Sequence, residues 1–275
     1  MRRAWMPAQS GVAEWMGDVR VRRHGVYLVS DEQSAELSAE LQPGDVLLAR
    51  KNWYLSNVAL PGFWPHAAIY FGPREELDRR FDLPEVRAEV RKLSGRDLSL
   101  GQYLAERFPA AWEAYGATRD GRRLCIMEAA SEGVQFSHFH EVAGDYLAAL
   151  RPRLAAAARA RALVEAFGHF AKPYDFDFDF ATDHAVVCTE LVWRSYRPAQ
   201  DKPGLEIPLV EVMGRRTLPA NEIARLFAAE RGKPGAQFDF VAFFDGREKT
   251  RRAERSDEAA FAESHRRPKW DVMMK

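Results

Sequence analysis

Cys188 is the side chain best suited to nucleophilic chemistry in this sequence. It follows the apolar residues 185–187 and begins the segment 188–196, whose pattern predicts a helix that ends before Pro198. The positive end of a helix dipole and the free backbone N–H groups there lower the pKa of a thiol. Cys188 is therefore a candidate thiolate nucleophile, and the alternative is a small apolar residue that packs in the core.

A thiolate nucleophile needs an imidazole that takes and returns its proton, and a carboxylate can orient that ring. His66 opens the apolar segment 66–72 directly after Pro65, at the start of a predicted strand. Glu128 ends the aliphatic segment 123–128, where its carboxylate could bind the second ring nitrogen. Each also has a structural interpretation, as a hydrogen-bonded histidine and as a solvent-facing glutamate. The residues alone leave both interpretations open.

Two other clusters are weak candidates for metal sites. His138 and His140 would share one face of a strand, but no Cys or acid cluster completes a ligand set. The alternating acids of 175–179 imitate the start of a calcium loop, yet Phe180 stands where glycine is needed and Val186 where glutamate is needed. Neither a phosphate-binding glycine loop nor a Gly-x-Ser-x-Gly elbow occurs. We therefore predict no metal and no cofactor.

Composition excludes several classes of protein. Forty basic residues balance forty acidic ones, so the formal net charge is zero and no overall field attracts nucleic acid. Two cysteines, Cys125 and Cys188, are too few for a disulfide scaffold, which favours a reducing compartment and a cytoplasmic location. We see no signal peptide and no segment apolar enough to cross a membrane. The oligomeric state cannot be predicted.

The elements that would position these side chains follow from periodicity and from turn residues. The predicted strands are 26–30, 46–50, 66–72, 123–128, 134–139, 146–150 and 238–244. The three strands between 123 and 150 suggest an antiparallel meander. The predicted helices are 154–170, 188–196 and a short helix with Asn221 as a possible cap.

The chain divides into three parts by texture. We expect an N-terminal extension at 1–36, a main domain at 37–245, and a charged tail at 246–275 that is a peripheral helix or partly disordered. Residues 73–120 have apolar positions at helical spacing and are expected to form a helical insertion outside the sheet. Deleting this insertion should change substrate selection more than folding.

Three segments taken together resemble a known family. They are Gln-Pro-Gly-Asp-Val-Leu-Leu (42–48) continuing to Trp-Pro-His-Ala-Ala-Ile-Tyr-Phe-Gly (64–72), Met-Glu-Ala-Ala-Ser-Glu-Gly-Val (127–134), and Lys-Pro-Tyr-Asp-Phe (172–176) continuing to Val-Val-Cys-Thr-Glu-Leu-Val-Trp (186–193). Their order and texture resemble the circularly permuted, YiiX-like branch of the NlpC-type papain-like hydrolases, which is related to lecithin retinol acyltransferase-like enzymes. In that branch the histidine strand precedes the cysteine helix. The match covers most of 40–245, and its specificity lies in the combination.

The resemblance implies an α+β fold, with a small, strongly curved antiparallel sheet packed on the cysteine helix. It also implies a triad in which Cys188 attacks a carbonyl, His66 is the base and then the acid, and Glu128 orients His66. The backbone N–H of Cys188 would supply part of an oxyanion hole. Tyr174 is a candidate substrate-side hydroxyl, and Glu132 is an alternative to Glu128.

The implied activity is that of a cysteine hydrolase or acyltransferase that cleaves an amide or ester bond in a peptide, amino-acyl or lipid substrate. The alternative is a catalytically inactive binding module that holds such a molecule in the same cleft. Trp53 and Trp64 are candidate substrate-binding residues, although core packing suits them equally well. The insertion would form a helical cap beside the cleft. The missing export signal puts cell-wall peptide in doubt as the substrate.

Overall fold

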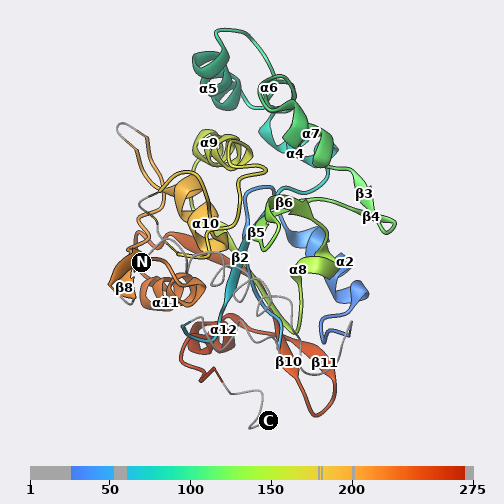
Figure 1. Cartoon of the computed structure of the whole chain (residues 1–275), viewed down its shortest axis with the longest axis vertical. Helices are drawn as coiled ribbons and strands as arrows, with labels where there is room; N and C mark the ends of the chain where they lie inside the picture. Colours follow the sequence, from blue (N-terminus) through green and yellow to red (C-terminus); the bar gives the residue numbers. More distant parts are fainter. Residues whose placement is uncertain are drawn as a thin grey trace, which may run out of the picture.

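The computed structural model describes residues 26–52, 61–178, 180, 182–199, 202–212 and 214–269. Two predictions lie outside these residues, because neither Trp53 nor Asp179 is among them. The described chain is built around one seven-stranded sheet with helices on both faces (Figure 1). An α+β architecture was expected, and the structure confirms it.

The strands of the sheet are β1 (Val46–Arg50), β2 (His66–Tyr70), β5 (Ile126–Ala130), β6 (Gly133–Ser137), β7 (Tyr146–Pro152), β10 (Phe238–Arg247) and β11 (Arg252–Ser256). Their spatial order is β11-β10-β7-β1-β2-β5-β6, and the neighbouring strands pair antiparallel. Two small hairpins lie outside the sheet, β3 (Thr118–Arg119) with β4 (Arg122–Arg123), and β8 (Val210–Val212) with β9 (Arg215–Thr217).

The helices are α2 (Asp31–Glu40), α4 (Arg74–Phe81), α5 (Pro84–Ser94), α6 (Leu100–Arg107), α7 (Pro109–Ala114), α8 (Phe139–Val142), α9 (Ala156–Phe167), α10 (Cys188–Tyr196), α11 (Ala220–Glu230) and α12 (Glu258–Ser264). Helices α2 and α8 contribute to the core on one face of the sheet. The other helices contribute to the larger core on the opposite face. Figure 1 shows α9 between α10 and the group α4–α7.

The central strands are apolar on both faces. In β1, Val46 and Leu48 belong to the larger core, whereas Leu47 and Ala49 belong to the smaller one. Side chains alternate across a strand, so a strand covered on both faces must be apolar at every position. This is why segment 46–49 reads as a continuous aliphatic run rather than as an alternating one.

Strand β7 corrects the expected meander. It pairs with β1 on one side and with β10 on the other, rather than with β6. Residues 146–150 are buried on both faces, and only a position inside the sheet can cover both. The segment 126–137 does form the expected hairpin of β5 and β6.

Three local predictions at helix starts are wrong. Residues 26–30 are not a strand but lead into α2, which begins after a Ser30–Gln33 capping box. His138 is the N-cap of α8 and His140 lies within that helix, so they do not share a strand face. Helix α11 has Pro219 at its N-cap, which leaves Asn221 inside the first turn. In each case the helix begins directly after its N-cap residue, which is Ser30, His138 or Pro219.

Residues 73–120 are mostly helical and lie outside the large sheet. The charged tail is more integrated than expected. Strand β11 extends the sheet beside β10, and Phe261 of α12 is fully buried in the larger core. The domain bounds of 37–245 stay a prediction, but the sheet itself continues to Ser256.

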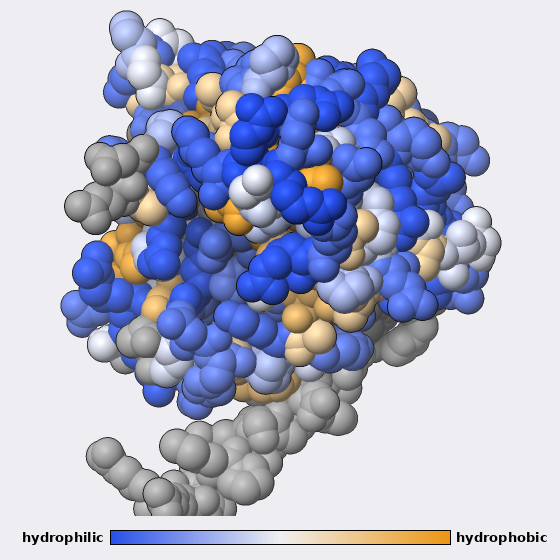
Figure 2. All heavy atoms as spheres, turned by 90° about the horizontal axis from the view of Figure 1, so that it is seen from above, coloured by the Kyte–Doolittle hydropathy of each residue, from blue (hydrophilic) through white to orange (hydrophobic). Residues whose placement is uncertain are grey.

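Hydrophilic residues cover most of the face shown in Figure 2, with apolar residues scattered among them. Many charged side chains form ion pairs across elements, such as Arg255 with Glu40 and Arg122 with Asp31. Exposed pairs of this kind contribute little to stability. Within the described ranges, no helix is both long and apolar enough to span a membrane.

Candidate active site

Cys188 is the first residue of α10, as the sequence predicts. Val187 before it is extended, and its backbone N–H donates to the Glu190 carboxylate at 3.3 Å. The helix packs against β2 and β5, the two strands that carry the other candidate residues. Cys188 is 5% exposed, and the backbone N–H groups of Ala67 and Thr189 donate to its sulfur.

His66 and Glu128 come from adjacent antiparallel strands. Tyr70 pairs with Ile126, so the alternation of side chains places His66 and Glu128 on the same face of β2 and β5. The His66 Nε2 atom lies 2.6 Å from Glu128 Oε2. A further hydrogen bond joins the His66 ring to the Cys188 thiol. Because Nε2 is hydrogen-bonded to Glu128, the ring nitrogen that bonds to the thiol is Nδ1.

The electrostatics of these three groups favour a charged chain. Burial by itself lowers the pKa of His66, but the charge of Cys188 and the bonds to Cys188 and Glu128 outweigh it and raise the pKa to about 10. Burial likewise opposes ionisation of Glu128, yet the His66 bond and charge lower its pKa to about 2. Against the same burial cost, His66 lowers the pKa of the Cys188 thiol. The arrangement is that of a thiolate, an imidazolium and a carboxylate.

Cys125 lies in the opposite kind of environment. It precedes β5, is 8% exposed, and belongs to the smaller core with Ile126 and Tyr70. Burial raises the pKa of its thiol to about 12, and Arg123 offsets only part of that effect. Cys125 is therefore a protonated, apolar packing residue at neutral pH.

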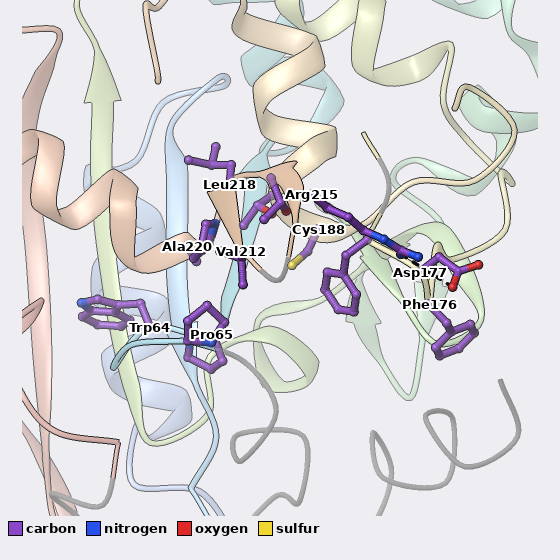
Figure 3. Close-up of a pocket in the computed structure, with 14 residues that line it drawn as sticks. Trp64, Pro65, Phe176, Asp177, Cys188, Val212, Arg215, Leu218 and Ala220 are labelled. Carbon is purple, nitrogen blue, oxygen red and sulfur yellow. Dashed lines mark ion pairs between the residues drawn. The ribbon is translucent and has the colours of Figure 1, made fainter. Parts of the chain in front are cut away.

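A cavity of about 440 Å³ opens beside Cys188 (Figure 3). Its wall comes from the loop before β2, the loop before α10, the β8–β9 hairpin and the start of α11. The lining residues are Pro61, Trp64, Pro65, Phe176, Asp177, Phe178, Cys188, Thr189, Val212, Arg215, Thr217, Leu218, Pro219 and Ala220. In this set no residue comes from 73–120, so the insertion does not form the expected cap on this cavity.

The remaining predicted residues lie at different distances from the chemistry. Trp64 lines the cavity, but it is fully buried and its Nε1–H donates to Ser264 Oγ, so core packing occupies most of it. Burial raises the pKa of Tyr174, and the negative charge of nearby Cys188 raises it further. Tyr174 itself contacts the rings of Phe176 and Phe178. Glu132 is exposed, and the carboxylate that binds His66 belongs to Glu128.

Arg194 holds the loop before Cys188 in place, a role the sequence analysis missed. Its guanidinium is 8% exposed, bonds to the Glu190 carboxylate and to the Asp183 carboxylate, and donates to the carbonyl oxygens of Phe180 and Thr182. The spacing of Glu190 and Arg194 by four residues was the available signal. No strand is predicted at 210–217, where the β8–β9 hairpin carries Arg215 into the cavity wall.

Among the described residues, neither of the two weak metal candidates gains a further ligand. His138 is the N-cap of α8, and His140 lies within that helix. In the described part of the chain, no group of three His, Cys, Asp or Glu side chains could hold a metal ion. Asp175 instead accepts from the backbone N–H of Asp177 at 2.9 Å, which forms a tight turn.

Comparison with known proteins supports the order of these elements. A family model described as "Permuted papain-like amidase enzyme, YaeF/YiiX, C92 family" matches residues 40–243. A search of curated proteins finds no match. One solved structure, described as the metalloprotein yiiX from Escherichia coli O157:H7, is 14% identical with a TM-score of 0.37, and the alignment covers 79% of this chain and 97% of that one. That likeness is too weak to support an argument.

The family match extends over far more than half of the chain and includes the strand of His66, the strand of Glu128 and the helix of Cys188. The histidine strand β2 precedes the cysteine helix α10 along the chain, which is the permuted order. The chain belongs to the permuted papain-like amidase family, YaeF/YiiX, C92.

Proposed function

We propose that this chain is a cysteine amidase in which Cys188, His66 and Glu128 act as a triad. The observation that carries the proposal is the hydrogen-bonded chain of thiol, imidazole and carboxylate, with the thiol in the wall of a cavity. A nucleophile held by a base that is itself oriented by a third group is the arrangement that covalent acyl transfer requires. Family membership supports the same chemistry.

In the proposed reaction the Cys188 thiolate attacks the carbonyl carbon of an amide. The backbone N–H of Cys188, at the free end of α10, donates to the oxyanion. The imidazolium of His66 then gives its proton to the leaving nitrogen, and the C–N bond breaks to leave a thioester on Cys188. His66, again neutral, takes a proton from water as the water attacks the thioester. The C–S bond then breaks, which releases the carboxylic acid and returns the Cys188 thiolate beside the His66 imidazolium. Glu128 keeps Nδ1 of His66 turned towards the sulfur throughout.

The same thioester could pass its acyl group to an acceptor other than water, which is the acyltransferase version of the proposal. The substrate class extends to peptide, amino-acyl and lipid amides or esters, because the cavity wall is mostly apolar and of moderate size. Tyr174 is proposed as a hydroxyl near the substrate on the strength of its electrostatic contact with Cys188.

Acylation by a simple ester and a simple amide tests the proposal. We expect butyryl p-nitrophenyl ester and butyryl p-nitroanilide to release their chromophores, and mass spectrometry to find a butyryl group on Cys188. Cys188→Ala should abolish turnover, and His66→Ala should reduce kcat/KM by about 1000-fold. Glu128→Gln should cost about tenfold or more, whereas Glu132→Gln, an exposed neighbour, should cost nothing.

Two results would contradict the triad. If the wild-type protein reacts no faster than Cys188→Ala, the chain is a binding module rather than an enzyme. If Glu132→Gln impairs turnover and Glu128→Gln does not, the third role is assigned to the wrong carboxylate.

A further inference from the structure

The β8–β9 hairpin presents alternate side chains to the cavity. Val212 pairs with Arg215 across the hairpin, and both line the cavity together with Thr217. Glu211 pairs with Arg216, and neither of these lines it. Side chains alternate along a strand, so a hairpin that covers the cavity turns one set of side chains towards it and the other set away from it. Arg215 therefore faces the cavity, and the adjacent Arg216 faces away.

Arg215 and Asp177 carry the formal charges of the cavity wall apart from the Cys188 thiolate. The other lining residues are apolar or threonine. Arg215 Nη1 lies 3.7 Å from Asp177 Oδ1, and the two side chains are 48% and 64% exposed. Figure 3 shows Arg215 reaching towards Asp177, with the Cys188 sulfur between this pair and the Pro65 side in that view. The charged pair thus lies on one side of the Cys188 sulfur, in a cavity wall that is otherwise mostly apolar.

The Arg215–Asp177 pair is easily opened by a competing anion. A separation of 3.7 Å is longer than a hydrogen bond, and half-exposed pairs are weak. A guanidinium has five N–H donors, and one carboxylate accepts from at most two of them in the bidentate arrangement. Arg215 is also the less exposed of the two, so its charge is less screened inside the cavity. Arg215 can therefore donate hydrogen bonds to a second carboxylate while the hairpin keeps its position.

We propose that Arg215 anchors an anionic group of the substrate, so that the site prefers acyl groups whose apolar chain ends in a carboxylate. The acyl carbonyl lies at Cys188, the chain lies against Val212 and Phe178, and the terminal carboxylate pairs with Arg215. This substrate preference rests on the proposed reaction at Cys188, but the anchor itself is a binding property that can be measured separately.

Alkylation of Cys188 measures the anchor without requiring turnover. Maleimidohexanoic acid and its neutral amide carry the same reactive head and chain, and they differ in the charge at the far end. We expect the acid to label Cys188 roughly five- to tenfold faster than the amide, the size of a half-exposed charged hydrogen bond. Added salt should reduce this ratio. Arg215→Gln should bring the ratio to about one, and Arg216→Gln, the matched control on the other face, should leave it unchanged.

A binding measurement provides the second test. In Cys188→Ala, where no thiol reacts, calorimetry should find hexanoate bound more tightly than hexanamide, and Arg215→Gln should remove the difference. Equal labelling of wild-type Cys188 by the two reagents together with equal binding of hexanoate and hexanamide would overturn the anchor. So would a ratio that survives Arg215→Gln, or one that Arg216→Gln also removes. A preference for an ammonium-ended reagent would assign recognition to Asp177 instead.

The two proposals fail in different ways. If the acid labels Cys188 faster but neither the ester nor the anilide releases its chromophore, the amidase proposal is refuted and the Arg215 anchor is supported. Turnover of those substrates without any preference for a terminal carboxylate would sink the anchor and keep the amidase.

Discussion

The two cysteines show how strongly a residue's surroundings decide its chemistry. Cys188 is the first residue of a helix, and its sulfur accepts hydrogen bonds from backbone N–H groups and bonds to His66. These interactions lower the pKa of its thiol despite burial. Cys125 is similarly buried, but Arg123 offsets only part of the burial effect, and the pKa of its thiol rises to about 12. The same side chain thus favours the thiolate in one place and stays a protonated packing residue in the other.

Iodoacetamide at about pH 6 to 7 should label Cys188 before Cys125. The thiolate of Cys188 forms as the pH rises through its lowered pKa, so labelling begins at a lower pH than for an ordinary thiol near 8.5. His66 stays protonated up to about pH 10, which preserves the ion pair across that range. Mass spectrometry of the folded protein gives the order of labelling.

His66→Ala should move the onset of labelling of Cys188 to higher pH, because the cation that favours the thiolate is lost. Cys125→Ser is the control and should leave the reactivity of Cys188 unchanged. Labelling of Cys125 first in the native protein would contradict the assignment of both residues.

At the scale of elements, the helical insertion is part of the core rather than a cap on the cavity. Helices α4, α5 and α6 contact α9, and Tyr115 after α7 is fully buried. The ring of Tyr115 stacks on Phe136 of β6 and meets Phe167 of α9 edge-on. We therefore revise the expectation that deletion changes substrate selection more than folding, because removing 73–120 would strip a face of the sheet of its aromatic cover.

Tyr115→Ala should lower the free energy of unfolding by about 3–5 kcal/mol, because it leaves a large cavity among packed rings. Tyr115→Phe keeps the ring and loses only the hydrogen bond from the hydroxyl to the Phe71 carbonyl, so it should cost about 1 kcal/mol. Urea unfolding measures both. In native buffer, labelling of Cys188 should be unaffected by either change, and a loss below about 1 kcal/mol for Tyr115→Ala would refute the core role.

At the scale of the whole molecule, distant segments meet to hold the loop that precedes His66. Asn221 of α11 accepts from the backbone N–H groups of Phe63 and Trp64, and its amide donates to the carbonyl of His265. Trp64 also donates to Ser264 in α12. The position of the imidazole strand thus depends on residues late in the chain.

Asn221→Ala should destabilise the protein by about 1–3 kcal/mol, since it leaves the buried Phe63 and Trp64 N–H groups without their acceptor. The loop before His66 should loosen, and kcat/KM for the p-nitrophenyl ester should fall with it. Arg225→Ala on the same helix is the control, because that exposed side chain pairs with Glu222 of its own helix and should change stability by less than about 0.5 kcal/mol. Equal effects of the two variants in urea unfolding and in turnover would argue against the Asn221 bridge.

Local sequence patterns predicted which residue types stand at the starts of the cysteine helix and the histidine strand. The apolar run before Cys188, the following helix pattern and the strand that His66 opens are contiguous signals. The strand of Glu128 is displaced from the predicted 123–128 to Ile126–Ala130, which places Glu128 at its centre rather than at its end. Periodicity, caps and turn residues act over a few positions, so they are legible without knowledge of the fold. The permuted order of histidine strand and cysteine helix is likewise a linear property of the chain.

Only the tertiary structure decided which strands and charges become neighbours. Three features join residues that are far apart in sequence. Strand β7 lies between β1 and β10, β11 and α12 complete the sheet and the core, and Arg215 forms part of the cavity wall. Strand order depends on which arrangement buries both faces of each apolar strand, and that comparison involves the whole chain. The 2.6 Å contact of His66 with Glu128 is set in the same way, because pairing of β2 with β5 spans the entire helical insertion.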